Sequence, residues 1–418
     1  MFRRFYEGLM AASRAHAKWD YEMSMNILRS RKRLAILGLM LVPIILGSVA
    51  FATELPDVLG GHKAYAPAFY TPAIFLVSIL IGLAAGLITG CIGAGGGFII
   101  TPALMSAGIK GILAVGTDLF HIFAKAIMGT AVHKKLGNVS VGLAIAFLVG
   151  SIAGVLGGGI LNRFIYELNP VMSDLFISLV YVFLLGFLGI YAMTDFLKLR
   201  KSDSGGGAHG SAPSGDKPGL PAKLQQAKIP PMIRFDEDLV PGGKRISAFF
   251  VAVCGGIVGF VAAIMGVGGG FLTFPMFVYI LGVSSFTTVG TDILQIIFTA
   301  GFASITQYAI YGFIFYTLAM GMLLGSLLGI QLGALTTKVV KGIYIRGFYA
   351  TAILAGFVNR LFALPSKLSD MNYLSMSDSA AAFWASVGNW AFFVVIGIFS
   401  VWVISKFFTN LKTLKGEA

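Results

Sequence analysis

The chain has 418 residues, of which 57% are hydrophobic and only 12% are charged. A soluble domain of this length cannot hide so much apolar surface, so the composition excludes a soluble globular protein and predicts a polytopic membrane protein. The formal net charge of +13 would also suit a protein that binds nucleic acid. The placement of the basic residues along the chain argues against nucleic acid as a partner.

The N-terminal part of the chain is expected to meet the membrane twice. Residues 1–33 mix basic residues with apolar ones such as Phe2 and Trp19. This pattern predicts an amphipathic helix on the cytoplasmic leaflet, with anionic membrane lipid as its partner. A loosely ordered basic tail is the alternative. The segment lacks the compact apolar core of a signal peptide, and residues 34–53 then predict an extra transmembrane helix.

Two glycine clusters interrupt long apolar runs: 93–97 (GAGGG) within 73–107, and 266–270 (GVGGG) within 245–282. Each cluster is followed by Phe and, five residues past its last glycine, by Pro. Each glycine costs a helix about 1 kcal/mol relative to Ala. At about 1.5 Å per residue the first run is too long for one crossing and short for two. We therefore expect a re-entrant or unequal hairpin with the glycines near its turn.

The rest of the chain reads as further transmembrane segments around a linker. They are expected at 112–133, 139–161 and 172–197, then at 286–310, 314–337 and 343–364, with a loop at 365–386 and a final helix at 388–408. Residues 198–244 are rich in Gly, Ser and Pro and predict a flexible cytoplasmic linker.

The two halves, 73–197 and 245–364, share more than their glycines. The sequence VGTD occurs at 115–118 and again at 289–292, and the pattern G-S-x-x-G recurs at a nearly constant offset. This predicts an internal duplication. The basic residues place both termini and the linker on the cytoplasmic side of the cytoplasmic (inner) membrane. The halves then start on opposite sides, so we expect an all-α protein with two inverted repeats, a signature of transporters.

These motifs resemble the TauE/SafE family of sulfite and organosulfonate exporters. The resemblance rests on GGGF followed by Pro, the V-G-T stretch, HKKLGNV at 133–139 and G-S-x-x-G. It implies a secondary transporter that exports a small sulfur-containing anion, such as sulfite, sulfoacetate or a related organosulfonate. One departure is Asp118 and Asp292, which stand where the family commonly has Ser.

The glycine clusters are the predicted substrate site. The first N–H groups of a helix have no internal partner and carry about half a positive charge, so helix starts after each break suit an anion. The predicted residues are Gly95, Gly96, Gly97 and Phe98 in the first half, and Gly268, Gly269, Gly270 and Phe271 in the second. No G-K-[ST] follows, which excludes a nucleotide-binding P-loop. The alternative is that the glycines only allow helices to pack closely.

Polar residues inside the apolar segments are the predicted coupling groups. Asp118, His121 and Lys125 share one helix face, and Asp292 and Gln295 lie on the matching face of the second half. The aspartates are expected to carry a proton and His121 to relay it. Alternatively, Asp118 and Lys125 only neutralise each other.

Two further pairs of polar residues have simpler expected roles. Thr117 and Thr291 are expected to donate hydrogen bonds to the substrate or to a hairpin. Asn359 and Arg360 lie near the end of a predicted helix and are expected at the membrane interface.

Other function classes are less consistent with the sequence. The five histidines are scattered, without the spacing of a metal site or of a nucleophile and its base, so we expect no enzyme, no catalytic residues, no metal and no cofactor. The cysteines Cys91 and Cys254 are expected to be small buried residues. Two alternatives to an anion exporter stay open: a cation- or proton-coupled carrier that uses the paired aspartates, and an anion channel.

Overall fold

The computed structural model describes eight stretches of the chain: 72–92, 96–133, 140–201, 220–227, 229–236, 243–337, 339–340 and 342–410. The predicted N-terminal segment 1–33, the predicted helix 34–53 and Gly95 lie outside the described residues, as does much of the predicted linker.

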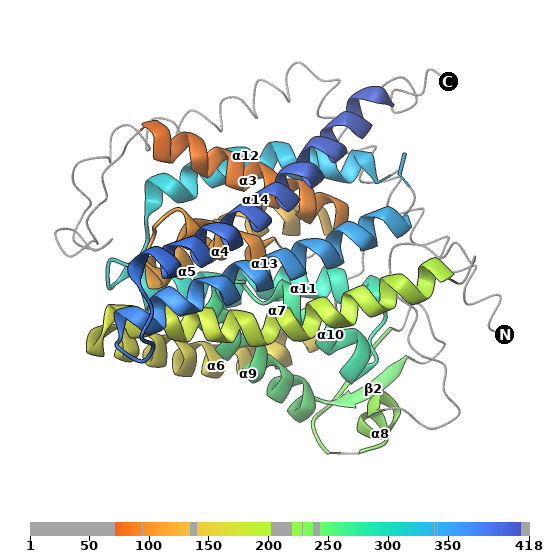
Figure 1. The fold of residues 1–418 in the computed structure, drawn as a ribbon. Coiled ribbons are helices and arrows are strands. Elements are labelled where there is room, and N and C mark those ends of the chain that lie inside the picture. Colours follow the sequence, from red (N-terminus) through yellow and green to blue (C-terminus); the bar gives the residue numbers. More distant parts are fainter. Residues whose placement is uncertain are drawn as a thin grey trace.

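The described part is a bundle of long helices with one small two-stranded ribbon (Figure 1). The first half consists of α3 (Pro72–Ile92), α4 (Gly97–Ser106), α5 (Gly111–His133), α6 (Val141–Leu168) and α7 (Pro170–Lys201). A connecting part follows, with α8 (Leu220–Gln226), β1 (Met232–Phe235) and β2 (Lys244–Ser247). The second half consists of α9 (Ala248–Met265), α10 (Gly270–Pro275), the π-helix η4 (Met276–Leu281), α11 (Ser285–Ala303), the π-helix η5 (Ser304–Ala309), α12 (Tyr316–Thr336) and α13 (Gly342–Asp370), and α14 (Asp378–Thr409) closes the chain.

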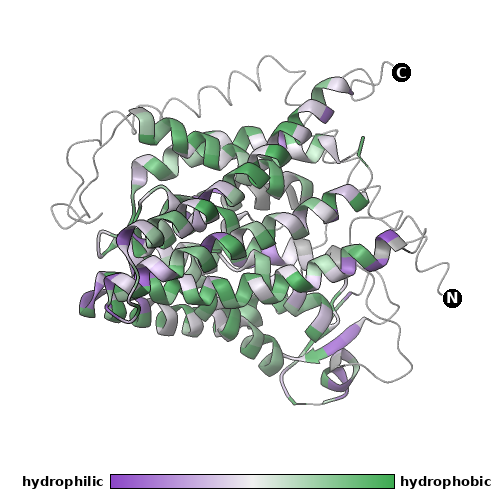
Figure 2. Ribbon diagram, in the orientation of Figure 1, coloured by the Kyte–Doolittle hydropathy of each residue, from purple (hydrophilic) through white to green (hydrophobic). Residues whose placement is uncertain are grey.

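Seven helices among the described residues are long and apolar enough to cross a membrane: α3, α6, α7, α9, α12, α13 and α14. Their hydrophobic residues dominate the body of the molecule, and hydrophilic residues lie mainly at the ends of the helices and on α8 and the ribbon (Figure 2). Large apolar side chains also face outward, with Phe183 79% and Trp390 73% exposed. Such a surface suits lipid rather than water. The protein is therefore an all-helical polytopic membrane protein, as expected.

In each half, one helix ends at the glycine cluster and the next helix begins there. α3 ends at Ile92 and α4 begins at Gly97, while α9 ends at Met265 and α10 begins at Gly270. Gly96 has φ +72° and Gly269 has φ +94°, a region of backbone conformation that L side chains rarely adopt. The glycines therefore end one helix and start the next.

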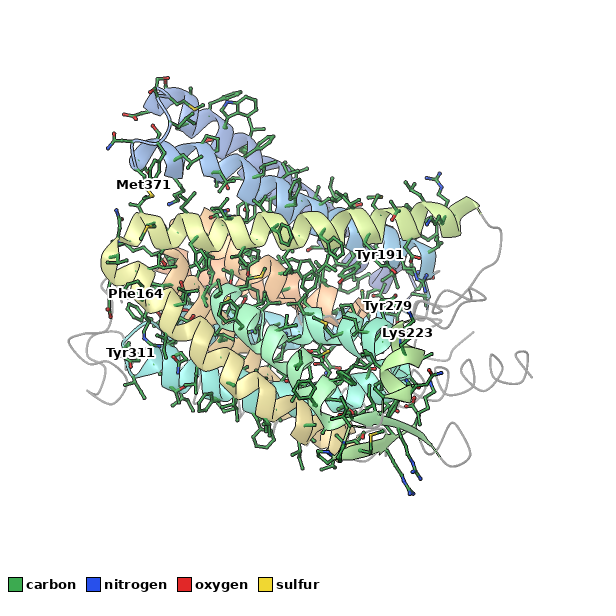
Figure 3. The ribbon with its side chains drawn as sticks, turned by 90° about the horizontal axis from the view of Figure 1, so that it is seen from below. Phe164, Tyr191, Lys223, Tyr279, Tyr311 and Met371 are labelled. Atoms are coloured by element: carbon green, nitrogen blue, oxygen red, sulfur yellow. The ribbon has the colours of Figure 1, made fainter. Side chains whose placement is uncertain are left out.

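The two ends of the molecule are easily told apart. Figure 3 shows Lys223 of α8, Tyr279 of η4 and Tyr191 of α7 at one end, which we call the linker end. It shows Phe164 of α6, Tyr311 after η5 and Met371 after α13 at the opposite end, which we call the far end.

The first helix of each half packs on the fourth helix of the other half. A Cβ built on Gly82 of α3 would lie 2.1 Å from the carbonyl oxygen of Met322 in α12, and Gly86 meets Ser326 one turn later. In the same way, Gly150 of α6 meets Ala252 of α9. The contacts advance together along each pair, so both pairs run parallel with backbones in close contact.

The last helices of the two halves, α7 and α13, pack directly on each other and run antiparallel. Asp174 at the start of α7 pairs with Lys367 near the end of α13, with 3.0 Å between carboxylate oxygen and Nζ. Asp195 near the end of α7 lies 3.7 Å from Arg346 near the start of α13. The helix α5 also runs antiparallel to α11 and its continuation η5. A Cβ built on Gly116 of α5 would meet Tyr308 of η5, and one built on Gly301 of α11 would meet Phe123 of α5.

The two broken hairpins open toward opposite ends. α4 ends at Ser106, whose hydroxyl binds the Arg360 guanidinium of α13 toward the far end. The second hairpin instead ends at the linker end, where Gln225 donates to the carbonyl of Leu281 and Lys244 to that of Gly282.

Two sequence expectations need correction. The connection between α13 and α14 spans only 371–377, shorter than the expected loop at 365–386, because α13 continues through Pro365 and Ser377 caps α14. The predicted flexible linker 198–244 contains helix α8 and strand β1. β1 pairs antiparallel with β2, and Asp236 after β1 accepts hydrogen bonds from both the backbone N–H and the hydroxyl of Ser284.

Candidate functional site

The two glycine breaks meet at the centre of the bundle. The rings of Phe98 and Phe271, the residues directly after the clusters, stack with centroids 4.9 Å apart and planes 24° apart. A Cβ built on Gly97 would lie 2.9 Å from the Cα of Val267 in the other cluster. The structure thus brings together the predicted residues Gly96, Gly97, Phe98, Gly268, Gly269, Gly270 and Phe271, all of them buried.

The helix starts at this meeting point present backbone N–H groups. The first backbone bonds of α4 and α10 run from Ile99 to the carbonyl of Gly96 and from Leu272 to that of Gly269. The N–H groups of Gly97 and Phe98, and of Gly270 and Phe271, come before these donors. They therefore have no backbone acceptor within their own helix. Because helix N-termini favour negative charge, two of them facing one centre suit a small anion.

The same glycines are also tightly packed. Cβ atoms built on Gly268 and Gly270 would lie 2.6 Å from Ile122 and 2.9 Å from Ile296. The packing explanation therefore has direct structural support beside the anion site. Gly270 also lies next to Asp292, whose Oδ2 would be 3.2 Å from an added Cβ.

Asp118 lies in a fully buried polar group on α5. The Thr101 hydroxyl donates to Asp118 Oδ2 at 3.1 Å, and His121 Nδ1 lies 3.8 Å from Asp118 Oδ1. His121 Nε2 is 2.8 Å from the hydroxyl of Ser326 on α12. Neither Asp118 Oδ1 nor His121 Nδ1 has a hydrogen-bond partner among the described residues. Lys125 interacts electrostatically with Asp118, so mutual neutralisation stays open.

The second half holds a related group around Asp292 on α11. Gln295 Nε2 donates to Asp292 Oδ1 at 2.7 Å, and the Thr299 hydroxyl donates to Gln295 Oε1 at 2.8 Å. The Ser151 and Thr299 hydroxyls are 2.9 Å apart. Hydrogen bonds thus connect Asp292, through Gln295 and Thr299, to Ser151 of the G-S-x-x-G motif in the first half. In the other group, His121 binds Ser326 of the second motif and lies close to Asp118 without a hydrogen bond to it.

Thr117 and Thr291 form equivalent contacts between the halves. The Thr117 hydroxyl oxygen accepts from the backbone N–H of Phe315 at 2.9 Å, and that of Thr291 accepts from Ser140 at 3.0 Å. Phe315 and Ser140 directly precede α12 and α6. In this structure the two threonines accept backbone hydrogen bonds at helix starts.

Tyrosines bind the carbonyls that the break in α9 leaves without helical partners. Tyr181 of α7 donates to the carbonyl of Met265 at 2.5 Å, and Tyr308 of η5 donates to that of Ala263. Backbone groups within a membrane need such partners, because no water is available to bind them. Side chains of neighbouring helices therefore satisfy the backbone carbonyls at the break in α9.

Two buried arginines were not predicted as part of a site. Arg360 is only 2% exposed and Asn359 is fully buried, so both side chains are enclosed by protein. Arg163 on α6 also follows an asparagine; its guanidinium donates to the carbonyl and Oε1 of Gln307 and lies 4.1 Å from the ring centroid of Tyr311. The signal available in the sequence was the charge inside an apolar run, which hydropathy averages conceal.

No group of three His, Cys, Asp or Glu side chains that would hold a metal ion occurs within the part of the chain that the structure describes. Both cysteines are free and buried.

Fold and site together define a multi-pass membrane transporter with two helix breaks at its centre. The chain belongs to the sulfite exporter TauE/SafE family, whose family model matches residues 78–360. It is 27% identical over 258 residues to the probable membrane transporter protein YjnA of Bacillus subtilis, covering 61% of this chain and 87% of the relative. It is 24% identical over 274 residues to the probable membrane transporter protein YunE of the same organism, covering 62% of this chain and 87% of the relative. No solved structure matches the chain.

Proposed function

We propose that this protein is a secondary transporter that exports a small sulfur-containing anion, such as sulfite or an organosulfonate, across the cytoplasmic membrane. The family description supports the substrate class. The observation that carries the proposal is the meeting of two helix N-termini at the stacked rings of Phe98 and Phe271. An anion held there would bind the backbone N–H groups of both clusters, Gly95 included.

The proposed architecture is a pair of inverted repeats with both termini in the cytoplasm. Three observations support it: the equivalent helices α7 and α13 are antiparallel, α5 and α11 are antiparallel, and the two hairpins open toward opposite ends. Such repeats allow the central site to face the two sides of the membrane in turn. The linker end would then be cytoplasmic.

In this proposal Asp118 and Asp292 carry the coupling proton, assisted by His121 and Gln295. The support is geometric: both carboxylates are buried, on the helices α5 and α11 that follow the two broken hairpins. Within the part of the chain that the structure describes, Asp118 Oδ1 has no hydrogen-bond partner. Thr117 and Thr291 keep a hydroxyl proton with which to donate to a ligand while they accept from the backbone.

The test is flux through purified protein in proteoliposomes. Radiolabelled sulfite should move at a saturable rate, and an imposed proton gradient should change that rate. Protein-free liposomes and chloride at equal ionic strength are the controls. Flux that never saturates would indicate a channel, and no flux of any sulfur anion would refute the proposal.

A cation-coupled carrier is the second candidate, favoured by the two aspartates at equivalent positions. It predicts that a sodium gradient drives flux at constant pH. Sodium-independent flux would exclude sodium coupling.

A further inference from the structure

Arg360 is a buried charge with neutral partners. Its Nη2 donates to the hydroxyl of Ser106 at 2.7 Å and to the carbonyl of Pro102 at 3.3 Å, and its Nε donates to Asn359 Oδ1 at 2.7 Å. No ion pair joins it to a carboxylate among the described residues. The nearby Asp174 is already engaged, by the N–H of Gly111 through one oxygen and by Lys367 through the other.

A guanidinium in a membrane-spanning helix is costly unless a counter-charge is present. The end of α4 offsets part of this cost, because carbonyls at a helix C-terminus carry partial negative charge. Neutral groups satisfy the donors without compensating the full positive charge. An anion bound beside Arg360 would supply the missing counter-charge.

Arg360 lies on α13 between the central glycine breaks and the far end of the molecule. Gly356 lies one turn earlier on α13, and a Cβ added to it would be 3.7 Å from the carbonyl oxygen of Phe98. The carbonyl of Pro102, which accepts from Arg360, directly follows Thr101, whose hydroxyl donates to Asp118 of the buried group on α5. Lys367 lies about two turns further along the same face of α13, and its side chain is 28% exposed. Arg360 and Lys367 thus follow one another along α13 from the helix breaks toward the far end, and Lys367 is paired with Asp174.

We propose that Arg360 is a recognition residue for the transported anion, which it binds between the central glycine breaks and the far end of the molecule. Nη1 of its planar fork makes none of the hydrogen bonds described above, and its N–H donors suit the oxygens of a sulfite or sulfonate group. This inference rests on the proposed anion transport. It adds a side-chain subsite on the path that the anion takes after leaving the centre.

The competing explanation is that Arg360 only holds the end of α4. Three variants separate the two roles. Arg360→Gln removes the charge, Arg360→Lys keeps the charge but loses the fork, and Ser106→Ala loses the contact with α4 while keeping the guanidinium. Arg346→Gln is the matched control, because it removes an arginine from the same helix at a site paired with Asp195.

The measurements are the apparent KM for sulfite flux in proteoliposomes and the rise in Tm that sulfite or sulfate causes in purified protein. Arg360→Lys should raise the KM by at least about ten-fold, which is ~1.4 kcal/mol of lost recognition. Arg360→Gln should remove the anion-dependent rise in Tm. Ser106→Ala and Arg346→Gln should leave the KM within about two-fold of the parent.

An unchanged KM and an unchanged rise in Tm in both Arg360 variants would overturn the inference. So would an equal effect of Ser106→Ala, since that variant retains the charge. Failure of the proposed function looks different. If sulfite does not move but sulfate still raises the parent's Tm and Arg360→Gln abolishes that rise, the subsite stands and the substrate assignment falls. If no anion affects the parent, Arg360 is structural.

Discussion

Phe98 and Phe271 are the first side chains after the two glycine clusters, and they stack on each other with centroids 4.9 Å apart. Each of the two residues directly follows a glycine cluster, so this contact joins the starts of α4 and α10. The breaks of both hairpins lie next to it. A substitution at one break is therefore expected to affect the other.

The first prediction concerns the glycine clusters. Gly97→Ala and Gly270→Ala should weaken anion binding by more than their loss of stability explains, because each added methyl group lies beside the proposed anion site. The methyl group at Gly97 would meet Val267 of the opposite break, and the one at Gly270 would meet Ile296 and Asp292. Tm and anion-dependent Tm shifts measured on the same samples would show this. Parallel loss of stability and binding would indicate that these glycines serve packing alone.

Two control glycines calibrate that experiment. A Cβ added to Gly325 of α12 would lie 2.0 Å from the carbonyl oxygen of Ile79. Gly325→Ala should therefore reduce stability through a steric clash with α3. Gly397 of α14 has open space around an added Cβ, and Gly397→Ala should be neutral or stabilising by up to about 1 kcal/mol.

The aspartates make the second prediction. Asp118→Asn and Asp292→Asn keep the size of the side chain but cannot release a proton. We expect both variants to lose the response of flux to a proton gradient while they retain exchange of anion for anion. Measuring the two modes in the same proteoliposomes tests this. A normal rate with a normal dependence on the gradient in both variants would assign the aspartates a structural role.

Thr117 and Thr291 make the third prediction. Thr117→Val and Thr291→Val should each lower the free energy of unfolding by about 1–3 kcal/mol, because a buried backbone N–H before α12 or α6 loses its acceptor. Thr288→Val is the control: the Thr288 hydroxyl is buried without a partner among the described residues, so its removal should be neutral or stabilising. Equal stability of all three variants would contradict the capping role.

Membrane topology makes the fourth prediction. In a background without Cys91 and Cys254, Ser204→Cys lies beyond the end of α7 and Ser369→Cys lies at the end of α13. Because α7 and α13 are antiparallel and directly packed, Asp174 with Lys367 marks the far end and Asp195 with Arg346 lies toward the linker end. An impermeant thiol reagent should label the two new cysteines from opposite sides. Labelling from the same side would exclude the inverted arrangement.

Much of the fold was predictable because it depends on local chemistry. Adjacent glycines allow a helix to break, since the missing Cβ removes the steric bias toward the right-handed helix. They do not force a break, because Gly157, Gly158 and Gly159 lie inside the continuous helix α6. The sequence predicted the breaks before Gly97 and Gly270 from glycine clusters at the same place in two long apolar runs. The seven apolar helices followed from apolar length, but α5 and α11, at the expected spans 112–133 and 286–310, are not among them. The repeated motifs predict an internal duplication. The family assignment rests on the same motifs.

The partners of polar residues were decided only by the tertiary structure. Hydropathy measures transfer into an apolar environment, and lipid and protein interior are alike in that respect. Apolar length therefore indicated that Arg360 lies in a helix, but not that the helix buries it against Ser106. Nor did it show that His121 meets Ser326 across 205 positions of sequence. Those contacts depend on how parallel and antiparallel helices from the two halves pack, which no single segment encodes.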